Sequence, residues 1–258
     1  MRKNFEKPNR VVIKLSSDLM ANKEKRINHS LLANLVEQIA ELHHEGIMSV
    51  LVTSGAVVSG QEDLNNQLKT KDEVIRKQVF SAVGQPRMMR NYYNIFLEHG
   101  IRCAQVLATK RDFEPGLHRE NMINCYEGLL SQNIIPIANE DHAVSLAMSC
   151  FSNNNELASL VAELIDADML ITLTQSVDIK DKVNGKESDE TSVLESQEHR
   201  LENFIQEFST GVAEMTSSLG VINMTSQKEI PSFLADGKIP KVILEIVNGF
   251  SLKSQVTA

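Results

Sequence analysis

"FSNNNELASLVAELIDADMLITLT", Phe151–Thr174, is the stretch of this sequence that decides the fold. A polar run opens it, and apolar residues then recur at helical spacing from Leu157 to Leu164. The run Met169–Thr174 is almost continuously apolar, as in a strand that is covered on both faces. The stretch therefore predicts a helix with an asparagine cap that leads into a buried strand.

The same alternation of helix and buried strand repeats along the chain. Leucine and isoleucine recur at helical spacing from Leu31 to Leu42, and Arg87–His99 is rich in helix formers. Strand-helix alternation of this kind predicts an α/β fold in which helices sandwich a mainly parallel sheet. The predicted strands are Arg10–Leu15, Met48–Ser54, Cys103–Thr109, Ile134–Asn139, Met169–Thr174 and Gly220–Thr225.

No internal repeat or shift in composition divides the 258 residues, so we expect a single domain over residues 1–258. The segment Asp178–Glu202 is polar and charged with little periodicity, which predicts a flexible loop within that domain. "KTKDEVIRK", Lys69–Lys77, is interpreted as the solvated start of a helix.

Composition narrows the partners and the compartment. The net charge of −8 and the pI of about 5.4 argue against a nucleic-acid or anionic-membrane partner. Cys103, Cys125 and Cys150 are odd in number and lack CxxC spacing, which favours thiols in a reducing compartment over a zinc site. With no apolar run approaching 18 residues, we expect a soluble cytoplasmic protein that holds no structural metal.

Polar residues gather where the predicted strands end. Ligands of open α/β sheets bind beyond the carboxyl ends of the strands, so these residues predict a site for a small anion. Two of them allow a second interpretation: the Gly55 turn is compatible with packing alone, and Lys14 with a lysine that extends to solvent. The strand-end groups are Lys14–Ser17, Thr53–Ala56, Asn139–His142 and Thr174–Gln175.

Five segments occur in the order and spacing of glutamate 5-kinases, which belong to the amino acid kinase family. The resemblance runs from Arg10 to about Thr174 and implies a three-layer α/β/α sandwich. It also implies transfer of the ATP γ-phosphoryl group, with Mg²⁺, to the side-chain carboxylate of glutamate in proline synthesis. The segments are "RVVIKLSS", "VLVTSGAVVSG", "KQVFSAVGQPRMMRNYYNIFLEHGIRCAQVLATKRDF", "NIIPIANED" and the opening stretch.

The resemblance implies further features of the chain and its site. It implies a homo-oligomer, and a short form without the C-terminal RNA-binding-like domain that many members carry. It makes Lys14 a catalytic lysine, with Asn155 and Thr216 at the other catalytic positions. Its substrate-binding positions are Ser54, Gly55, Ala56, Asn139, His142, Asn153 and Asn154. Its nucleotide-binding positions are Ser16, Thr174, Gln175, Thr210 and Gly211.

Several of these positions depart from the family pattern. Asn153 and Asn155 stand where the family has aspartates, and Thr216 where it has a second catalytic lysine. An amide keeps the shape of a carboxylate but loses the charge that holds ammonium groups. Three further positions differ: Ser16 replaces a glycine, His142 an aspartate of the substrate pocket, and Gln175 an aspartate of the nucleotide site.

These departures predict weakened Mg·ATP binding and slow or absent phosphoryl transfer. On this hypothesis the chain is a pseudokinase retained to bind glutamate or a related anion, or to assemble with itself or with an active paralogue. The alternative is an active glutamate 5-kinase in which Asp141, Asp166, Asp168 or Asp178 supplies the missing carboxylate. A third hypothesis has the pocket bind a different anion that protonated His142 recognises.

Overall fold

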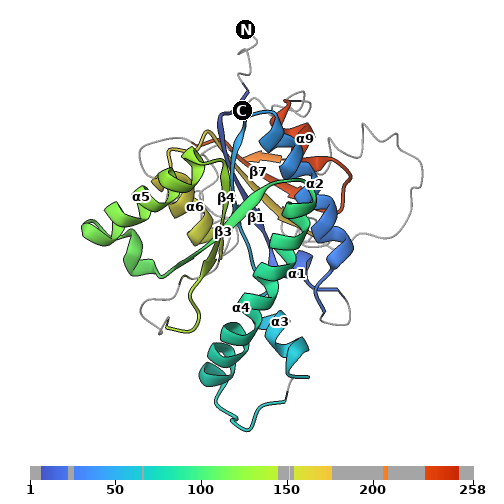
Figure 1. Ribbon diagram of the computed structural model, residues 1–258, viewed down its shortest axis with the longest axis vertical. Helices are drawn as coiled ribbons and strands as arrows, with labels where there is room; N and C mark the ends of the chain where they lie inside the picture. Colours follow the sequence, from blue (N-terminus) through green and yellow to red (C-terminus); the bar gives the residue numbers. More distant parts are fainter. Residues whose placement is uncertain are drawn as a thin grey trace.

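A single mainly parallel sheet forms the centre of the protein (Figure 1). The computed structural model describes residues 7–22, 26–65, 67–144, 151, 154–175, 206–208 and 230–249. Within these, the strand order is β3-β4-β2-β1-β5-β7-β6, and every neighbouring pair is parallel except β6 with β7. The strands are β1 (Arg10–Leu15), β2 (Met48–Val52), β3 (Arg102–Ala108), β4 (Ile134–Glu140), β5 (Met169–Thr174), β6 (Gln206–Phe208) and β7 (Ser232–Asp236).

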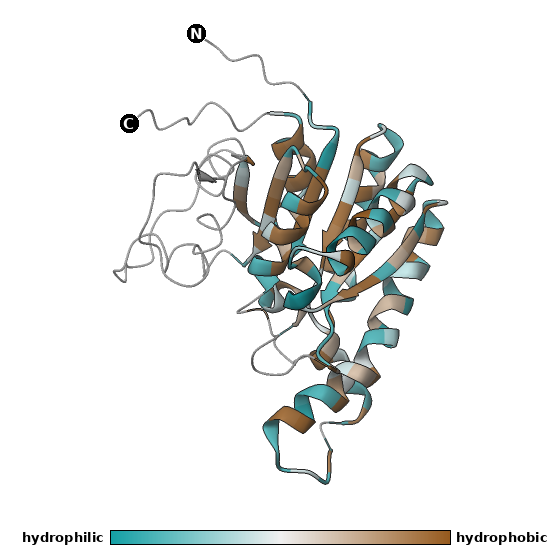
Figure 2. Ribbon diagram, turned by 90° about the vertical axis from the view of Figure 1, so that its left-hand side faces the viewer, coloured by the Kyte–Doolittle hydropathy of each residue, from teal (hydrophilic) through white to brown (hydrophobic). Residues whose placement is uncertain are grey.

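Helices cover both faces of this sheet. On one face lie α2 (His29–His44), α4 (Glu73–Glu98) and α9 (Val242–Val247), and on the other α5 (Leu117–Ser131) and α6 (Asn154–Leu164) (Figure 1). Side chains of β1 alternate between the two cores: Val11 and Ile13 join the first, and Val12 the second. Figure 2 shows the strands as mostly hydrophobic ribbons between helices of mixed hydropathy. The expected three-layer α/β/α sandwich is confirmed.

The predicted elements correspond closely to the observed ones, with a few differences. Five predicted strands match β1 to β5 to within two residues at each end, and Gly220–Thr225 lies outside the described residues. Strand β7 was not predicted because its five residues begin and end in polar side chains. Helix α4 begins at Glu73, within the segment Lys69–Lys77 that was interpreted as a helix start, and it continues through Pro86 and the helix formers that follow. The loop predicted at 178–202 lies outside the described residues.

Helix α3 (Ala56–Asp63) and the first half of α4 form a hairpin that extends beyond the sheet (Figure 1). The two helices cross in direct backbone contact at two glycines. A Cβ added to Gly84 would lie 1.9 Å from the carbonyl oxygen of Ala56, and one added to Gly60 would lie 1.9 Å from that of Phe80. Only glycine allows this approach, which places α4 beside the turn that follows β2.

Two buried residues of α4 hold it against the sheet. Tyr92 and Met88 are fully buried in the core, whereas Tyr93 is 50% exposed. The hydroxyl oxygen of Tyr92 lies 2.5 Å from Oγ1 of Thr53, at the end of β2, and burial raises the pKa of this phenol. No helix of the described chain is long and apolar enough to cross a membrane.

Candidate functional site

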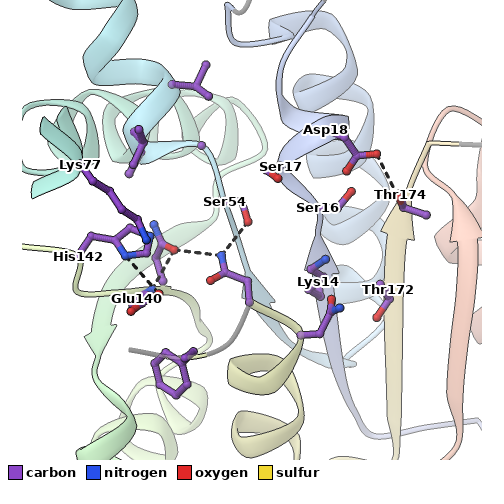
Figure 3. Close-up of a pocket in the computed structure, with 18 of the residues that line it drawn as sticks. Lys14, Ser16, Ser17, Asp18, Ser54, Lys77, Glu140, His142, Thr172 and Thr174 are labelled. Atoms are coloured by element: carbon purple, nitrogen blue, oxygen red, sulfur yellow. Dashed lines mark hydrogen bonds and ion pairs between the residues drawn. The ribbon is translucent and has the colours of Figure 1, made fainter. Parts of the chain in front are cut away.

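A cavity of about 430 Å³ lies at the carboxyl ends of β1, β2, β4 and β5 (Figure 3). This is the edge of the sheet where open α/β proteins bind ligands, and the volume suits a small molecule. Ten of the predicted site residues line it: Lys14, Ser16, Ser54, Gly55, Ala56, Asn139, His142, Asn154, Asn155 and Thr174. It is also lined by Ser17, Asp18, Val57, Val58, Lys77, Glu140, Phe151, Thr172 and Leu234.

Lys14 reaches the cavity because of its register in β1. It pairs with Val52 of β2 on one side and with Thr172 of β5 on the other. Because strand side chains alternate, Lys14 shares the sheet face of Val12, which α5 and α6 cover. The residue is only 7% exposed. Lys14 is therefore a buried lysine of the cavity wall and not one that extends to solvent.

The turn after β2 depends on Gly55. Its φ of 108° lies in the left-handed region, where a side chain would be strained. This conformation turns the chain after β2 and starts α3 at Ala56, so the three consecutive residues Ser54, Gly55 and Ala56 line the cavity. The glycine is required by the backbone turn itself, as the packing interpretation proposed, and the same turn forms a wall of the cavity.

Asn154 joins this turn to the end of β4. Its Nδ2 lies 2.7 Å from the carbonyl oxygen of Thr53, 2.7 Å from Oγ of Ser54 and 3.4 Å from Oδ1 of Asn139. Buried hydrogen bonds of this type each stabilise a fold by about 1 kcal/mol. Asn154 is the first residue of α6, and its side-chain amide therefore positions Ser54 and Asn139.

Asn139 continues this network towards α4 and the edge strand. Its Nδ2 donates to Oε1 of Gln85 at 3.0 Å, and Nε2 of Gln85 donates to Oε1 of Gln105 at 2.9 Å. Oδ1 of Asn139 accepts from the backbone N–H of Glu140 at 2.9 Å. Neutral amides thus connect four elements without a net charge, and they fix the polar floor of the cavity before a ligand arrives.

Glu140 and His142 form an acid–imidazole pair at the end of β4. Nδ1 of His142 lies 3.2 Å from Oε2 of Glu140, and the two side chains are 14% and 3% exposed. Both side chains also line the cavity, so an acid and an imidazole lie together on its wall. Figure 3 shows the pair on one wall of the cavity, with the side chain of Lys77 extending towards it.

Asp18, in α1 (Ser17–Met20), forms the opposite end of the cavity together with the end of β5. Its Oδ2 accepts from Oγ1 of Thr174 at 3.0 Å and from the backbone N–H of Gln175 at 3.1 Å (Figure 3). The side-chain amide of Gln175 donates to the backbone oxygen of Asp18, and its Oε1 accepts from Nζ of Lys238 at 3.0 Å. Gln175 itself does not line the cavity.

Two carboxylates proposed to complete the site, Asp166 and Asp168, lie at the amino-terminal ends of the strands, away from the cavity. Oδ2 of Asp168, just before β5, accepts from the backbone N–H groups of Asn9 and Arg10 at the start of β1. The pKa of Arg10 is raised, chiefly by its hydrogen bond to Glu127 and less by the charges of Asp166 and Asp168. That hypothesis is wrong for Asp166 and Asp168, because both residues precede β5 and the cavity lies beyond its carboxyl end.

Other candidates have a different outcome. Oδ1 of Asp141 accepts from the N–H of Ala143 in its own turn, and Asp141 is not among the residues that line the cavity. Asp178, Asn153, Thr210, Gly211 and Thr216 lie outside the described residues.

Sequence reasoning missed two charged residues of the cavity, Asp18 and Lys77. Lys77 belongs to the segment interpreted as a solvated helix start, and the α3–α4 hairpin brings it to the site. Asp18 directly follows the predicted strand-end group, so its position along the chain was the available signal.

The fold is matched in proteins of known type. The model of the amino acid kinase family matches residues 9–214. The chain belongs to the amino acid kinase family. A UMP kinase from Bacillus anthracis has the same fold, with a TM-score of 0.59, 13% identity and coverage of 95% of this chain and 93% of that one.

Within the family, the chain is related to glutamate 5-kinases. It is 35% identical to the glutamate 5-kinase of Bacteroides thetaiotaomicron over 92% of this chain and 66% of that protein. It is 31% identical to the glutamate 5-kinase of Alkaliphilus oremlandii over 94% of this chain and 93% of that protein. The chain thus spans just under two thirds of the length of some relatives and nearly all of others.

Proposed function

We propose that this amino acid kinase homologue binds glutamate or a related small dicarboxylate in the cavity, and that it transfers phosphoryl groups from ATP slowly or not at all. The observation that carries this proposal is the position of Asp18. Its carboxylate accepts hydrogen bonds from Thr174 and from the N–H of Gln175, the two residues that the family resemblance assigns to the nucleotide. A nucleotide phosphate would meet a like charge there.

The rest of the cavity supports binding of a small anion. The cavity contains buried Lys14, the hydroxyl of Ser54 and the amide of Asn139, all held in place before binding. Oγ of Ser16 is buried beside it and has no hydrogen-bond partner among the described residues. Donors that are already oriented bind an anion without a further ordering cost.

Mg²⁺ is a poor fit to the described part of this site. Asp18 and Glu140 are the carboxylates that line the cavity within the described ranges, and each already holds protein groups. Magnesium prefers carboxylate oxygens in octahedral geometry. The described residues contain no group of three or more His, Cys, Asp or Glu able to hold a metal ion. We therefore assign no step of the chemistry to a metal.

Isothermal titration of one protein preparation with L-glutamate, and separately with Mg·ATP, tests this proposal. We expect heat of binding for glutamate and little or none for Mg·ATP. Asp18→Asn removes the like charge and is expected to increase Mg·ATP affinity. Asp72→Asn, which keeps a cap at the start of α4 outside the cavity, is the matched control. Wild-type protein that binds Mg·ATP as tightly as glutamate would contradict the proposal.

The retained lysine favours a second candidate, an active glutamate 5-kinase with a rearranged site. Buried Lys14 and the Ser54-Gly55-Ala56 turn occupy the positions that the resemblance assigns to phosphoryl transfer and substrate. A hydroxylamine assay separates the candidates, because it traps the acyl phosphate that this reaction forms. A hydroxamate product that depends on both glutamate and ATP would establish the active enzyme.

Two further expectations belong to this proposal. We propose that the chain forms a homo-oligomer and can assemble with an active paralogue, which light scattering on the purified protein and on mixtures tests. We also propose that it works in the cytoplasm. Fractionation that places it in the membrane or outside the cell would contradict this.

A further inference from the structure

Lys77 contributes a second ammonium group to the cavity, on the wall opposite the strand that carries Lys14. It belongs to the second turn of α4, in the hairpin that extends beyond the sheet. Lys14 comes from β1, so two elements bring one lysine each to the same 430 Å³ space (Figure 3). Two separated cations in one small cavity suit a ligand with an anionic group at each end.

Contacts of the neighbouring residue fix Lys77 at this wall. Nε2 of Gln78 donates to the carbonyl oxygen of Ala143 at 3.2 Å, which ties α4 to the turn that carries His142. Asp72 caps the start of α4 by accepting from the N–H groups of Val74 and Ile75. The side chain of Lys77 is therefore carried by a capped helix anchored beside the cavity.

The charge of Lys77 is available to a ligand. Among the described residues, no carboxylate forms an ion pair with Lys77, and the nearby acid Glu140 lies against His142 instead. Lys77 is an exposed residue that lines the cavity, and its ammonium group attracts a carboxylate and repels another ammonium group. The wall formed by Lys77 and His142 is thus suited to a carboxylate without a neighbouring positive charge.

We propose that Lys77 binds a ligand carboxylate at this wall and makes the cavity select small dicarboxylates that carry no amino group. The inference rests on the proposed function, since it specifies the ligand of the same cavity. On this basis glutarate and 2-oxoglutarate bind more tightly than L-glutamate. The added ammonium group of glutamate meets the charge of Lys77, and Glu140, the carboxylate that lines this wall, lies 3.2 Å from Nδ1 of His142.

Isothermal titration of the full chain with glutarate, 2-oxoglutarate and L-glutamate tests the inference. For wild-type protein we expect glutarate to bind about two- to fivefold more tightly than L-glutamate, because charge contacts of exposed side chains change affinity by factors of that order. Lys77→Met is expected to weaken glutarate binding by about two- to fivefold and to reduce the difference in affinity between the two ligands. Lys77→Arg retains the charge and is expected to keep most of the affinity.

Lys71→Met is the matched control, because Lys71 is an exposed lysine of the same segment that does not line the cavity. It is expected to leave all three affinities unchanged. Glutarate binding that is equal in wild type and Lys77→Met, or L-glutamate binding tighter than glutarate, would overturn the inference and leave the proposed function standing. Wild-type protein that binds none of the three dicarboxylates would overturn both.

Discussion

Gly84→Ala perturbs the contact that places α4 beside the cavity. The added Cβ would lie 1.9 Å from the carbonyl oxygen of Ala56 and 2.4 Å from the backbone nitrogen of Gly60. The first distance is about 1.5 Å short of the 3.4 Å at which ordinary contact begins, and both atoms belong to the backbone of α3. The hairpin must therefore open, since no side chain can rotate out of the way.

The expected net loss of stability is about 2 kcal/mol. Overpacking typically costs 1–3 kcal/mol, and the higher helix propensity of alanine recovers only part of it, about 1 kcal/mol. The backbone clash places the cost at or above the upper end of that range. Urea unfolding followed by circular dichroism measures the change, and dicarboxylate titration is expected to weaken too, because Gly55, Ala56 and Lys77 shift with the hairpin.

Gly128→Ala is the matched control for this prediction. Gly128 lies within α5, and a Cβ there would meet nothing within 4 Å. The substitution should therefore stabilise the protein by about 1 kcal/mol through helix propensity alone. If Gly84→Ala were as stable as wild type, or were stabilised like Gly128→Ala, the direct contact between α3 and α4 would be refuted.

Three further substitutions test other parts of the structure. Burial and the charge of His44 lower the pKa of His43, so the unfolded chain takes up a proton more readily, and stability should fall as pH falls below 6.5. Urea unfolding should show that the free energy of unfolding falls less between pH 8 and pH 5.5 for His43→Gln than for wild type. An equal fall in the two proteins would contradict this. Lys110→Met removes the ammonium group that lies 2.5 Å from the buried carboxylate of Glu156, and it should lower the free energy of unfolding by about 1–3 kcal/mol. Adding Glu156→Gln should recover part of this loss, and an unchanged melting temperature of Lys110→Met would count against the ion pair. Asp72→Ala should cost about 1 kcal/mol, measured by urea unfolding, because two N–H groups of α4 lose their acceptor, whereas Asp72→Asn should cost little.

Much of the fold follows from patterns that the sequence displays directly. Nearly continuous apolar runs identified β1, β2, β4 and β5, because strands covered on both faces must be apolar on both, and a similar run identified the partly exposed edge strand β3. The period of two along β1 also places Lys14 at the cavity once Leu15 ends the strand. These features are local, so they can be inferred without knowing which strands are neighbours.

Features that depend on distant contacts could not be inferred in this way. Lys77 reaches the cavity only because α3 and α4 cross at Gly60 and Gly84. The role of Asp18 depends on the pairing of β1 with β5, which brings Thr174 to it. Length and composition give no sign of either contact.

The amides of the opening stretch have a physical role that the sequence did not reveal. An asparagine at position 154 was expected in the substrate pocket because of the family resemblance. The structure places its Nδ2 between Thr53, Ser54 and Asn139, where a carboxylate could accept but not donate. The amide at this position therefore stabilises the cavity itself.

The central claim is that the chain keeps the anion-binding cavity of an amino acid kinase and has lost efficient phosphoryl transfer. Release of ADP from Mg·ATP in the presence of saturating L-glutamate tests it most directly, with Lys14→Met measured in parallel to identify contaminating ATPase. We predict a turnover far below the 1–100 s⁻¹ that is typical of kinases, and equal in wild type and Lys14→Met. A glutamate-dependent turnover within that range that Lys14→Met abolishes would contradict the claim.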